Sequence, residues 1–141
     1  MIEQMATLNK VGEELGKIKG VTAMTDVTGF GLLGHLTEMC EASNASAEIA
    51  FDKVPWINKE MLEDYLQQGC IPGGTNRNWD SYGHKIDLKD DAQKNILADP
   101  QTSGGLLIAV DKDAPDFDAF ARKNSFVEIG HLEENGSCTM I

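Results

Sequence analysis

Apolar and polar residues follow two different periods along this chain, and each period predicts a different kind of element. Apolar residues recur every three or four positions from Met5 to Ile18, which predicts an amphipathic helix that ends at Gly20. The unbroken apolar run Gly105–Val110 has the length of a buried strand. The same criteria predict strands at 21–25, 47–51, 127–132 and 137–141, and helices at 32–42, 58–68, 90–97 and 114–124.

Two polar stretches complete this pattern. Pro72–Lys89 predicts a long irregular loop with at most a helical turn, and Asn135-Gly136 predicts a hairpin that joins the last two strands. Helices and strands are mixed without repeats or a low-complexity linker. The pattern therefore predicts one α+β domain in which helices pack against a sheet.

Composition narrows the class of protein. The 141 residues are 41% hydrophobic and 25% charged, which is typical of one soluble globular domain, and no run has the length of a membrane span. The net charge of −11 argues against nucleic acids and anionic membranes as partners. Cys40, Cys70 and Cys138 have no metal-binding spacing and predict reduced thiols in a cytoplasmic protein.

The candidate chemistry begins at Asp26, which lies where the strand 21–25 runs into a glycine-rich turn. Asp26 has two interpretations, a Mg²⁺ ligand beside a phosphate group or an acid that caps the turn. Gly29, Gly31 and Gly34 form a G-x-G-x-x-G pattern that can hold a pyrophosphate or allow tight packing of a helix on a sheet. Asp52 has the spacing of a dinucleotide-binding acid, although the chain lacks the strand–helix rhythm of such folds.

Two further segments are rich in small and polar residues. Asp99–Gly105 could bring backbone donors close to a ligand or could simply close a turn. Ile71–Asn78 contains Arg77, which is either a contact for phosphate or a partner domain, or a solvated surface residue. The three histidines share no triad or metal spacing and are expected to be surface or packing residues; they are His35, His84 and His131.

Together the three segments resemble the C-terminal domain of the selenophosphate synthetases. Thr25–His35, Pro72–Thr75 and Asp99–Leu107 are similar to three signatures of that family in the same order. The resemblance covers nearly the whole chain. It implies a three-layer α/β/α domain of the aminoimidazole ribonucleotide synthetase C-terminal type, partly ferredoxin-like.

The resemblance also implies a function for the longer protein. That protein would convert selenide, ATP and water to selenophosphate, AMP and phosphate, with Mg²⁺ and ATP held between two domains. Asp26 would supply the one metal ligand of this domain. Residues 1–141 would be a single C-terminal domain whose partners are its own N-terminal ATP-binding domain, the substrates selenide and ATP, and a second copy in a homodimer.

The family's reactive Cys or selenocysteine and its other metal-binding acids belong to the N-terminal half, so the chain alone is expected to be inactive. The amphipathic residues that begin almost at Met1, without a convincing cap, agree with a domain cut from a longer chain. The alternatives are another member of the superfamily, a purine-biosynthesis ligase or a hydrogenase-maturation dehydratase, or a non-catalytic binding domain in which Asp26 is structural.

Overall fold

Helices and strands are mixed along the chain in the computed structural model, which describes residues 2–88, 90–134 and 138–140. The helices are α1 (Ile2–Met5), α2 (Val11–Leu15), α3 (Gly31–Ser43), α4 (Lys59–Gln67), α5 (Gly73–Tyr82), α6 (Asp91–Leu97) and α7 (Phe117–Lys123), with short 3-10 helices η1 (Phe51–Lys53) and η2 (Gly83–Lys85). The strands are β1 (Val21–Asp26), β2 (Ala45–Ile49), β3 (Ile86–Asp87), β4 (Leu106–Val110), β5 (Gly130–Glu134) and β6 (Cys138–Met140). This mixture confirms the predicted α+β class.

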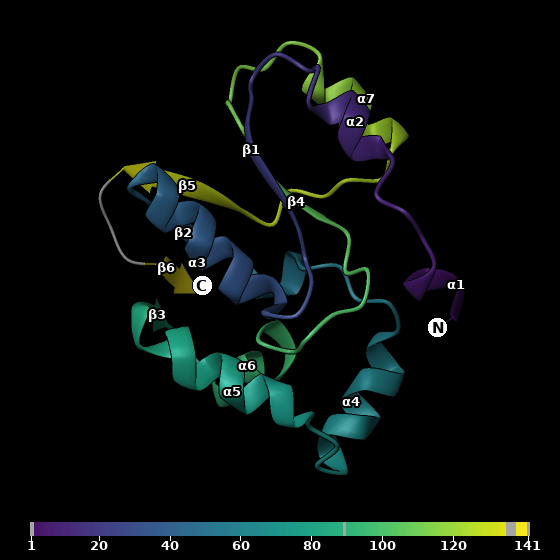
Figure 1. The fold of residues 1–141 in the computed structure, drawn as a ribbon, viewed down its shortest axis with the longest axis vertical. Coiled ribbons are helices and arrows are strands. Elements are labelled where there is room, and N and C mark those ends of the chain that lie inside the picture. The colour runs from purple at the N-terminus through teal and green to yellow at the C-terminus, as the bar shows by residue number, and fades with distance from the viewer. Residues whose placement is uncertain (1, 89, 135–137, 141) are drawn as a thin grey trace.

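The described strands form two sheets. β1 pairs with β4 in an antiparallel ribbon, and the other four strands form a sheet in the order β3-β6-β2-β5 (Figure 1). β2 is antiparallel to β5 and parallel to β6. The predicted hairpin is therefore wrong. β2 lies between β5 and β6 and pairs with both, so the last two strands do not pair with each other. The turn of the predicted hairpin, residues 135–137, falls outside the described residues.

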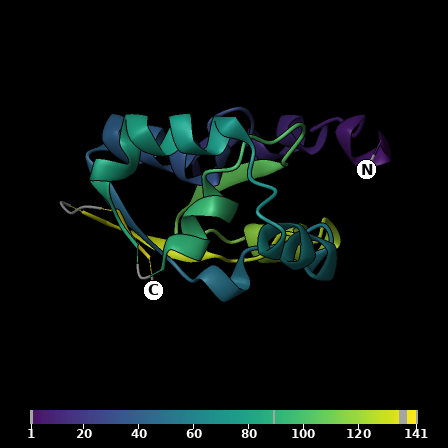
Figure 2. The ribbon, with the colours of Figure 1, turned by 90° about the horizontal axis from the view of Figure 1, so that it is seen from below.

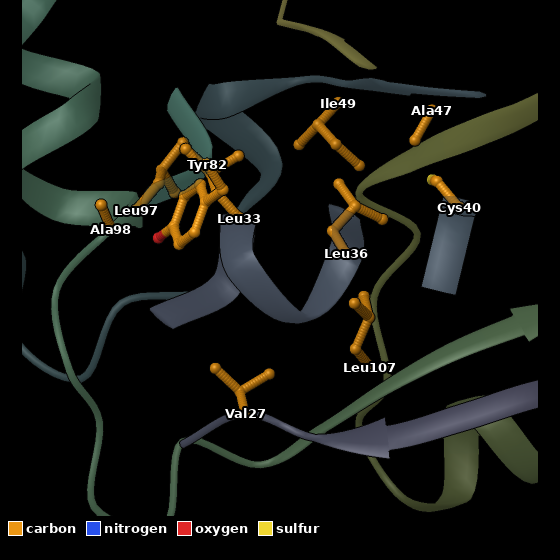
Figure 3. Packing of buried hydrophobic residues seen from close by; sticks show 10 residues of the cluster. All are labelled: Val27, Leu33, Leu36, Cys40, Ala47, Ile49, Tyr82, Leu97, Ala98 and Leu107. Carbon is orange, nitrogen blue, oxygen red and sulfur yellow. The ribbon is translucent and has the colours of Figure 1, made fainter. Parts of the chain in front are cut away.

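Helix α3 is the centre of the core. Its residues Leu33, Leu36 and Cys40 are buried at the three- and four-residue spacing that the sequence pattern predicts. Figure 3 shows Leu33 near Tyr82, Leu97 and Ala98, and Leu36 between Ile49 of β2 and Leu107 of β4. Viewed from below, α3 and α5 lie along one side of the molecule and β5 along the other (Figure 2).

The predicted helix over residues 5–18 is broken. Residues 6–10 leave the helix between α1 and α2, and Thr7 Oγ1 donates a hydrogen bond to Glu3 O at 2.8 Å. Met5 and Leu8 are exposed, and Leu15 is the apolar residue of this stretch that is fully buried. Because short helices need a buried face to be stable, the apolar period alone does not hold one continuous helix here.

The predicted loop 72–89 is also wrong, since ten of its residues form α5. Two glycines and a polar composition hide this helix from propensity-based reasoning. Thr75, Asn78 and Tyr82 are nevertheless buried at helical spacing on one face. Their polar groups are satisfied by hydrogen bonds to other segments, and this makes a buried polar helix face possible.

Candidate functional site

The glycine-rich turn after β1 and the loop before β4 are held together by their backbones. Val27 N donates to Gly105 O and Gly104 N donates to Val27 O, both at 3.0 Å. Gln101 N donates to Thr28 O at 2.9 Å. These bonds extend the β1–β4 ribbon into the two motif segments, so that two of the three sequence motifs share one corner of the molecule.

Asn78 brings the third segment to the same corner. Its side-chain amide donates to Gly29 O at 2.8 Å and to Ala98 O at 2.9 Å, and the residue is buried. Tyr82, one helical turn further along α5, donates its hydroxyl to Phe30 O at 2.6 Å. Residues 26–31, 74–82 and 98–105 therefore form one hydrogen-bonded unit, which we call the motif junction.

A buried hydroxyl of α5 orients Asp99, the acid of the loop before β4. Thr75 Oγ1, on a residue with no exposed surface, donates to Asp99 Oδ1 at 3.0 Å, and Gln101 Nε2 donates to Asp99 Oδ2 at 2.9 Å. Burial raises the pKa of Asp99 above its usual value of 3.8, while the two hydrogen bonds act in the opposite direction. Both carboxylate oxygens of Asp99 accept hydrogen bonds, so this side chain stabilises the conformation of the loop.

Two of the three motif glycines are required by close packing. A Cβ on Gly31, whose φ is +71°, would lie 2.8 Å from the backbone of Leu97 and Ala98. A Cβ on Gly34 would lie 2.8 Å from the Tyr82 ring, whereas Gly29 has open space. Gly31 and Gly34 therefore allow close packing, but α3 packs there against the end of α6 and the Tyr82 ring of α5 and not, as the packing interpretation expected, against a sheet.

His35 is buried on α3 and links the turn to the helix surface. Its Nε2 lies 3.1 Å from Thr28 Oγ1 and its Nδ1 lies 3.2 Å from Glu38 Oε2, which belongs to a mostly exposed side chain. A carboxylate facing Nδ1 favours the proton on that nitrogen, so that Nε2 accepts from the threonine. His35 is therefore a packing residue, as expected, that also fixes the Thr28 side chain.

Asp26 differs from Asp99, whose two carboxylate oxygens both accept hydrogen bonds. It is exposed at the end of β1, and within the described part of the chain its carboxylate makes no hydrogen bond or ion pair. Its backbone is fixed by pairing with Leu106 in β4. The capping interpretation predicted a backbone N–H on this carboxylate, and the structure places none there.

Comparison with known proteins decides the family. Residues 2–141 match the family described as "AIR synthase related protein, C-terminal domain". The chain belongs to this family. Among curated relatives, the selenide, water dikinase of Pasteurella multocida strain Pm70 is 57% identical over 112 residues, covering 79% of this chain and 31% of that protein. The selenide, water dikinase of Photorhabdus laumondii is 50% identical over 139 residues, covering 96% of this chain and 40% of that protein.

The chain thus spans about a third of the length of the curated relatives it matches. The resemblance to a selenophosphate synthetase C-terminal domain is confirmed, and so is the AIR synthase C-terminal type of fold. The thiamine-monophosphate kinase of Stenotrophomonas maltophilia K279a shares 16% identity over 86% of this chain and 31% of its own, with a TM-score of 0.47. No helix in the described residues is long and apolar enough to cross a membrane.

The Asp26 carboxylate has the chemistry of a single Mg²⁺ ligand. Mg²⁺ accepts one or two carboxylates and completes its shell with water and phosphate oxygens. Among the described residues, Asp26 does not belong to a group of three side chains that could hold an ion. Asp26 can therefore offer one oxygen ligand, and the other ligands of a Mg²⁺ ion would have to be phosphate, water or other protein groups.

The other residues singled out by sequence take different positions. Asp52 is exposed in η1, and β1 pairs with an antiparallel neighbour, so the geometry of a dinucleotide-binding fold is absent from the described strands. Arg77 is exposed on α5, and its side chain makes no ion pair in the part of the chain that the structure describes. Its proposed contact with phosphate or a partner domain stays a prediction.

Sequence reasoning missed the residues that join the three motifs, above all Asn78 and Tyr82. Thr75, Asn78 and Tyr82 have helical spacing. Two of them are polar, however, so a search for periodic apolar residues does not detect this helix face. The loop also holds Ser103 at a φ of +59°, where its hydroxyl donates to Thr7 O at 2.6 Å. This bond ties the N-terminal segment to the motif junction.

Proposed function

We propose that this domain forms one wall of the active site of an ATP-dependent selenophosphate synthetase. In the longer protein, selenide, ATP and water would give selenophosphate, AMP and phosphate. The proposal is supported by relatives named selenide, water dikinase at 50–57% identity. It rests on one observation in the domain itself, the exposed and unpaired Asp26 carboxylate on a rigid backbone.

In this proposal Asp26 supplies one Mg²⁺ ligand. A carboxylate that binds Mg²⁺ must be held in place, yet its oxygens must not already be engaged by a cationic side chain or by hydrogen-bond donors. The backbone bonds around Val27 and Thr28 hold the turn, and the Asp26 side chain remains available. The bound Mg²⁺ would neutralise phosphate charge during phosphoryl transfer.

The rest of the machinery would come from outside residues 1–141. We propose an N-terminal ATP-binding domain that supplies the reactive residue and the other metal-binding acids, and a homodimeric arrangement of the longer protein. Because phosphoryl transfer needs several positioned cations around the phosphates, the isolated chain is expected to be inactive. Selenide-dependent ATP turnover by the 141-residue chain alone would contradict this part of the proposal.

The test is phosphorus NMR of the longer protein with Mg-ATP and selenide, comparing the parent with its Asp26→Asn variant. Changes outside the first coordination shell already lower metal affinity or activity about 10- to 100-fold, so loss of a ligand should lower turnover at limiting Mg²⁺ at least about tenfold. Raising the Mg²⁺ concentration should restore part of it. Asp113→Asn, an exposed acid in the loop after β4, is the matched control and should retain full turnover.

The same variant separates a metal ligand from a structural acid. The Asp26 carboxylate makes no hydrogen bond or ion pair among the described residues, so Asp26→Asn should change the free energy of unfolding by less than about 0.5 kcal/mol. A folded variant with unchanged turnover would overturn the metal role. A parent that forms only ADP would place the domain in another branch of the superfamily.

A further inference from the structure

Three side chains with metal-binding atoms meet on the four-stranded sheet, whereas Asp26 belongs to the separate β1–β4 ribbon. Glu48 of β2 lies opposite His131 of β5 in the antiparallel register. Glu133 follows His131 by two residues and therefore shares its face of the sheet. On β2 the core-facing residues Ala47 and Ile49 flank Glu48, so the three side chains lie on the face that points away from the core.

We propose that Glu48, His131 and Glu133 form a binding site for a divalent first-row transition ion of the Zn²⁺ type. The donor set is one imidazole nitrogen and two carboxylates. Imidazole and carboxylate together suit Zn²⁺ and its neighbours, whereas Mg²⁺ prefers oxygen ligands alone. The site thus differs in chemistry from the single carboxylate at the motif junction, and it does not depend on the function proposed for that junction.

The distances match the coordination polyhedron of such an ion. His131 Nε2 lies 3.5 Å from Glu48 Oε2 and 3.4 Å from Glu133 Oε1. Ligands about 2.0–2.2 Å from a tetrahedral ion are separated by about 3.3–3.6 Å. All three ligand atoms lie within 4.8 Å of one another. A small rotation of one glutamate side chain would therefore bring the two carboxylate oxygens to the same ligand separation.

Charge and exposure also favour a cation. Two carboxylates and a neutral imidazole carry a charge of −2 in a chain whose net charge is −11. The side chains of Glu48, His131 and Glu133 are 32%, 55% and 64% exposed, which leaves a path for the ion and a fourth position for water. The alternative is an ion pair in which a protonated His131 bridges the two glutamates without any metal.

A metal titration of the 141-residue chain distinguishes these two states. Cys70 and Cys138 are replaced by serine in all samples, because thiolates would compete for soft ions. Calorimetry with Zn²⁺ should give one saturable site, and Co²⁺ should give the visible absorption of a tetrahedral complex. A large excess of Mg²⁺ should displace neither ion.

Three variants make the assignment specific. Glu133→Gln and His131→Ala should each weaken Zn²⁺ binding at least about tenfold, because each removes a ligand. His84→Ala, which removes an exposed histidine of η2, should bind as the parent does. Circular dichroism checks the fold, and Glu133→Gln keeps the shape of an exposed side chain should His131→Ala disturb β5.

The proposal is overturned by an absence of saturable Zn²⁺ binding, which would leave the ion-pair alternative. It is also overturned if both ligand variants fold and bind Zn²⁺ as tightly as the parent, since the ion would then lie elsewhere. Loss of binding in the ligand variants but not in His84→Ala supports it.

Discussion

The motif junction and the segment around α4, residues 57–70, contain the same two residue types in different roles. Each has a glycine in the left-handed region, Gly31 at a φ of +71° and Gly69 at +74°. Each also has a side-chain-bonded asparagine: Asn78 reaches across the fold to two carbonyls, and Asn58 caps its own helix by accepting from Met61 N at 3.0 Å.

The difference lies in what surrounds them. A Cβ at Gly31 would meet backbone atoms of a distant segment, whereas a Cβ at Gly69 would meet nothing within 4 Å. Helix α4 has no buried residue, and Ile57 and Tyr65 are exposed. A left-handed glycine and a bonded asparagine therefore only bound a helix at α4, whereas at the motif junction they join three segments. Tertiary packing, not the residue type, decides how much a substitution costs.

The largest expected effect comes from alanine at the two left-handed glycines. Both variants lose about 1–2 kcal/mol because an alanine is strained at positive φ. Gly31→Ala adds overpacking against Leu97 and Ala98, worth about 1–3 kcal/mol, and should lose about 2–5 kcal/mol in all. Urea unfolding followed by circular dichroism measures both, and equal losses would contradict the close packing at the motif junction.

Alanine substitutions of Asn78 and Asn58 compare the same two regions, with smaller expected losses of stability than Gly31→Ala. Asn78→Ala leaves the buried Ala98 O without its donor, at about 1–3 kcal/mol, and removes the part-buried bond to Gly29 O, at about 0.5–1.5 kcal/mol, so a total loss of about 1.5–4.5 kcal/mol is expected. Asn58→Ala removes an exposed helix cap, at about 1 kcal/mol. Asn76→Ala, an exposed position on α5, is the control and should lie within about 0.5 kcal/mol of the parent. An Asn78→Ala loss no larger than that of Asn58→Ala would refute the bridging role.

The same contrast explains how far the sequence could predict this molecule. Helices α3, α4 and α6 have local signals, an apolar period or a cap such as Asp90, whose side chain accepts from Ala92 N at 2.9 Å. Their prediction is confirmed. The order of the four-stranded sheet depends on pairing between distant strands, and the Asn135-Gly136 signal could not reveal that β2 lies between β5 and β6.

The candidate site divides in the same way. Asp26 and its glycines were found because they are consecutive in sequence. Asn78 was missed because its two acceptors lie 49 and 20 residues away, and only the folded chain brings them together. The exposed, unbonded state of Asp26 likewise follows from the packing of its neighbours and not from its motif.

The smallest of the three effects concerns the pH dependence of stability. Burial raises the pKa of Asp99 in the folded protein, so the folded chain holds this proton more tightly than the unfolded chain does. The resulting stability is fully present below the ordinary carboxyl pKa of 3.8 and is lost as the pH rises through the raised value. Urea unfolding across this acidic range should show the loss in the parent but not in Asp99→Asn, which cannot ionise.

Two further variants test whether the motif junction causes this pH dependence. Thr75 Oγ1 donates to the Asp99 carboxylate and favours its charged form, so Thr75→Val should raise the pKa further and extend the loss of stability to higher pH. Asp64→Asn, in α4, removes an exposed acid that bonds Gln68 and leaves the motif junction intact, so the pH dependence from Asp99 should remain. If Asp99→Asn kept the parent's pH dependence and Asp64→Asn abolished it, the acid that responds to pH would belong to α4. The buried hydroxyl of Thr75 would then serve packing alone.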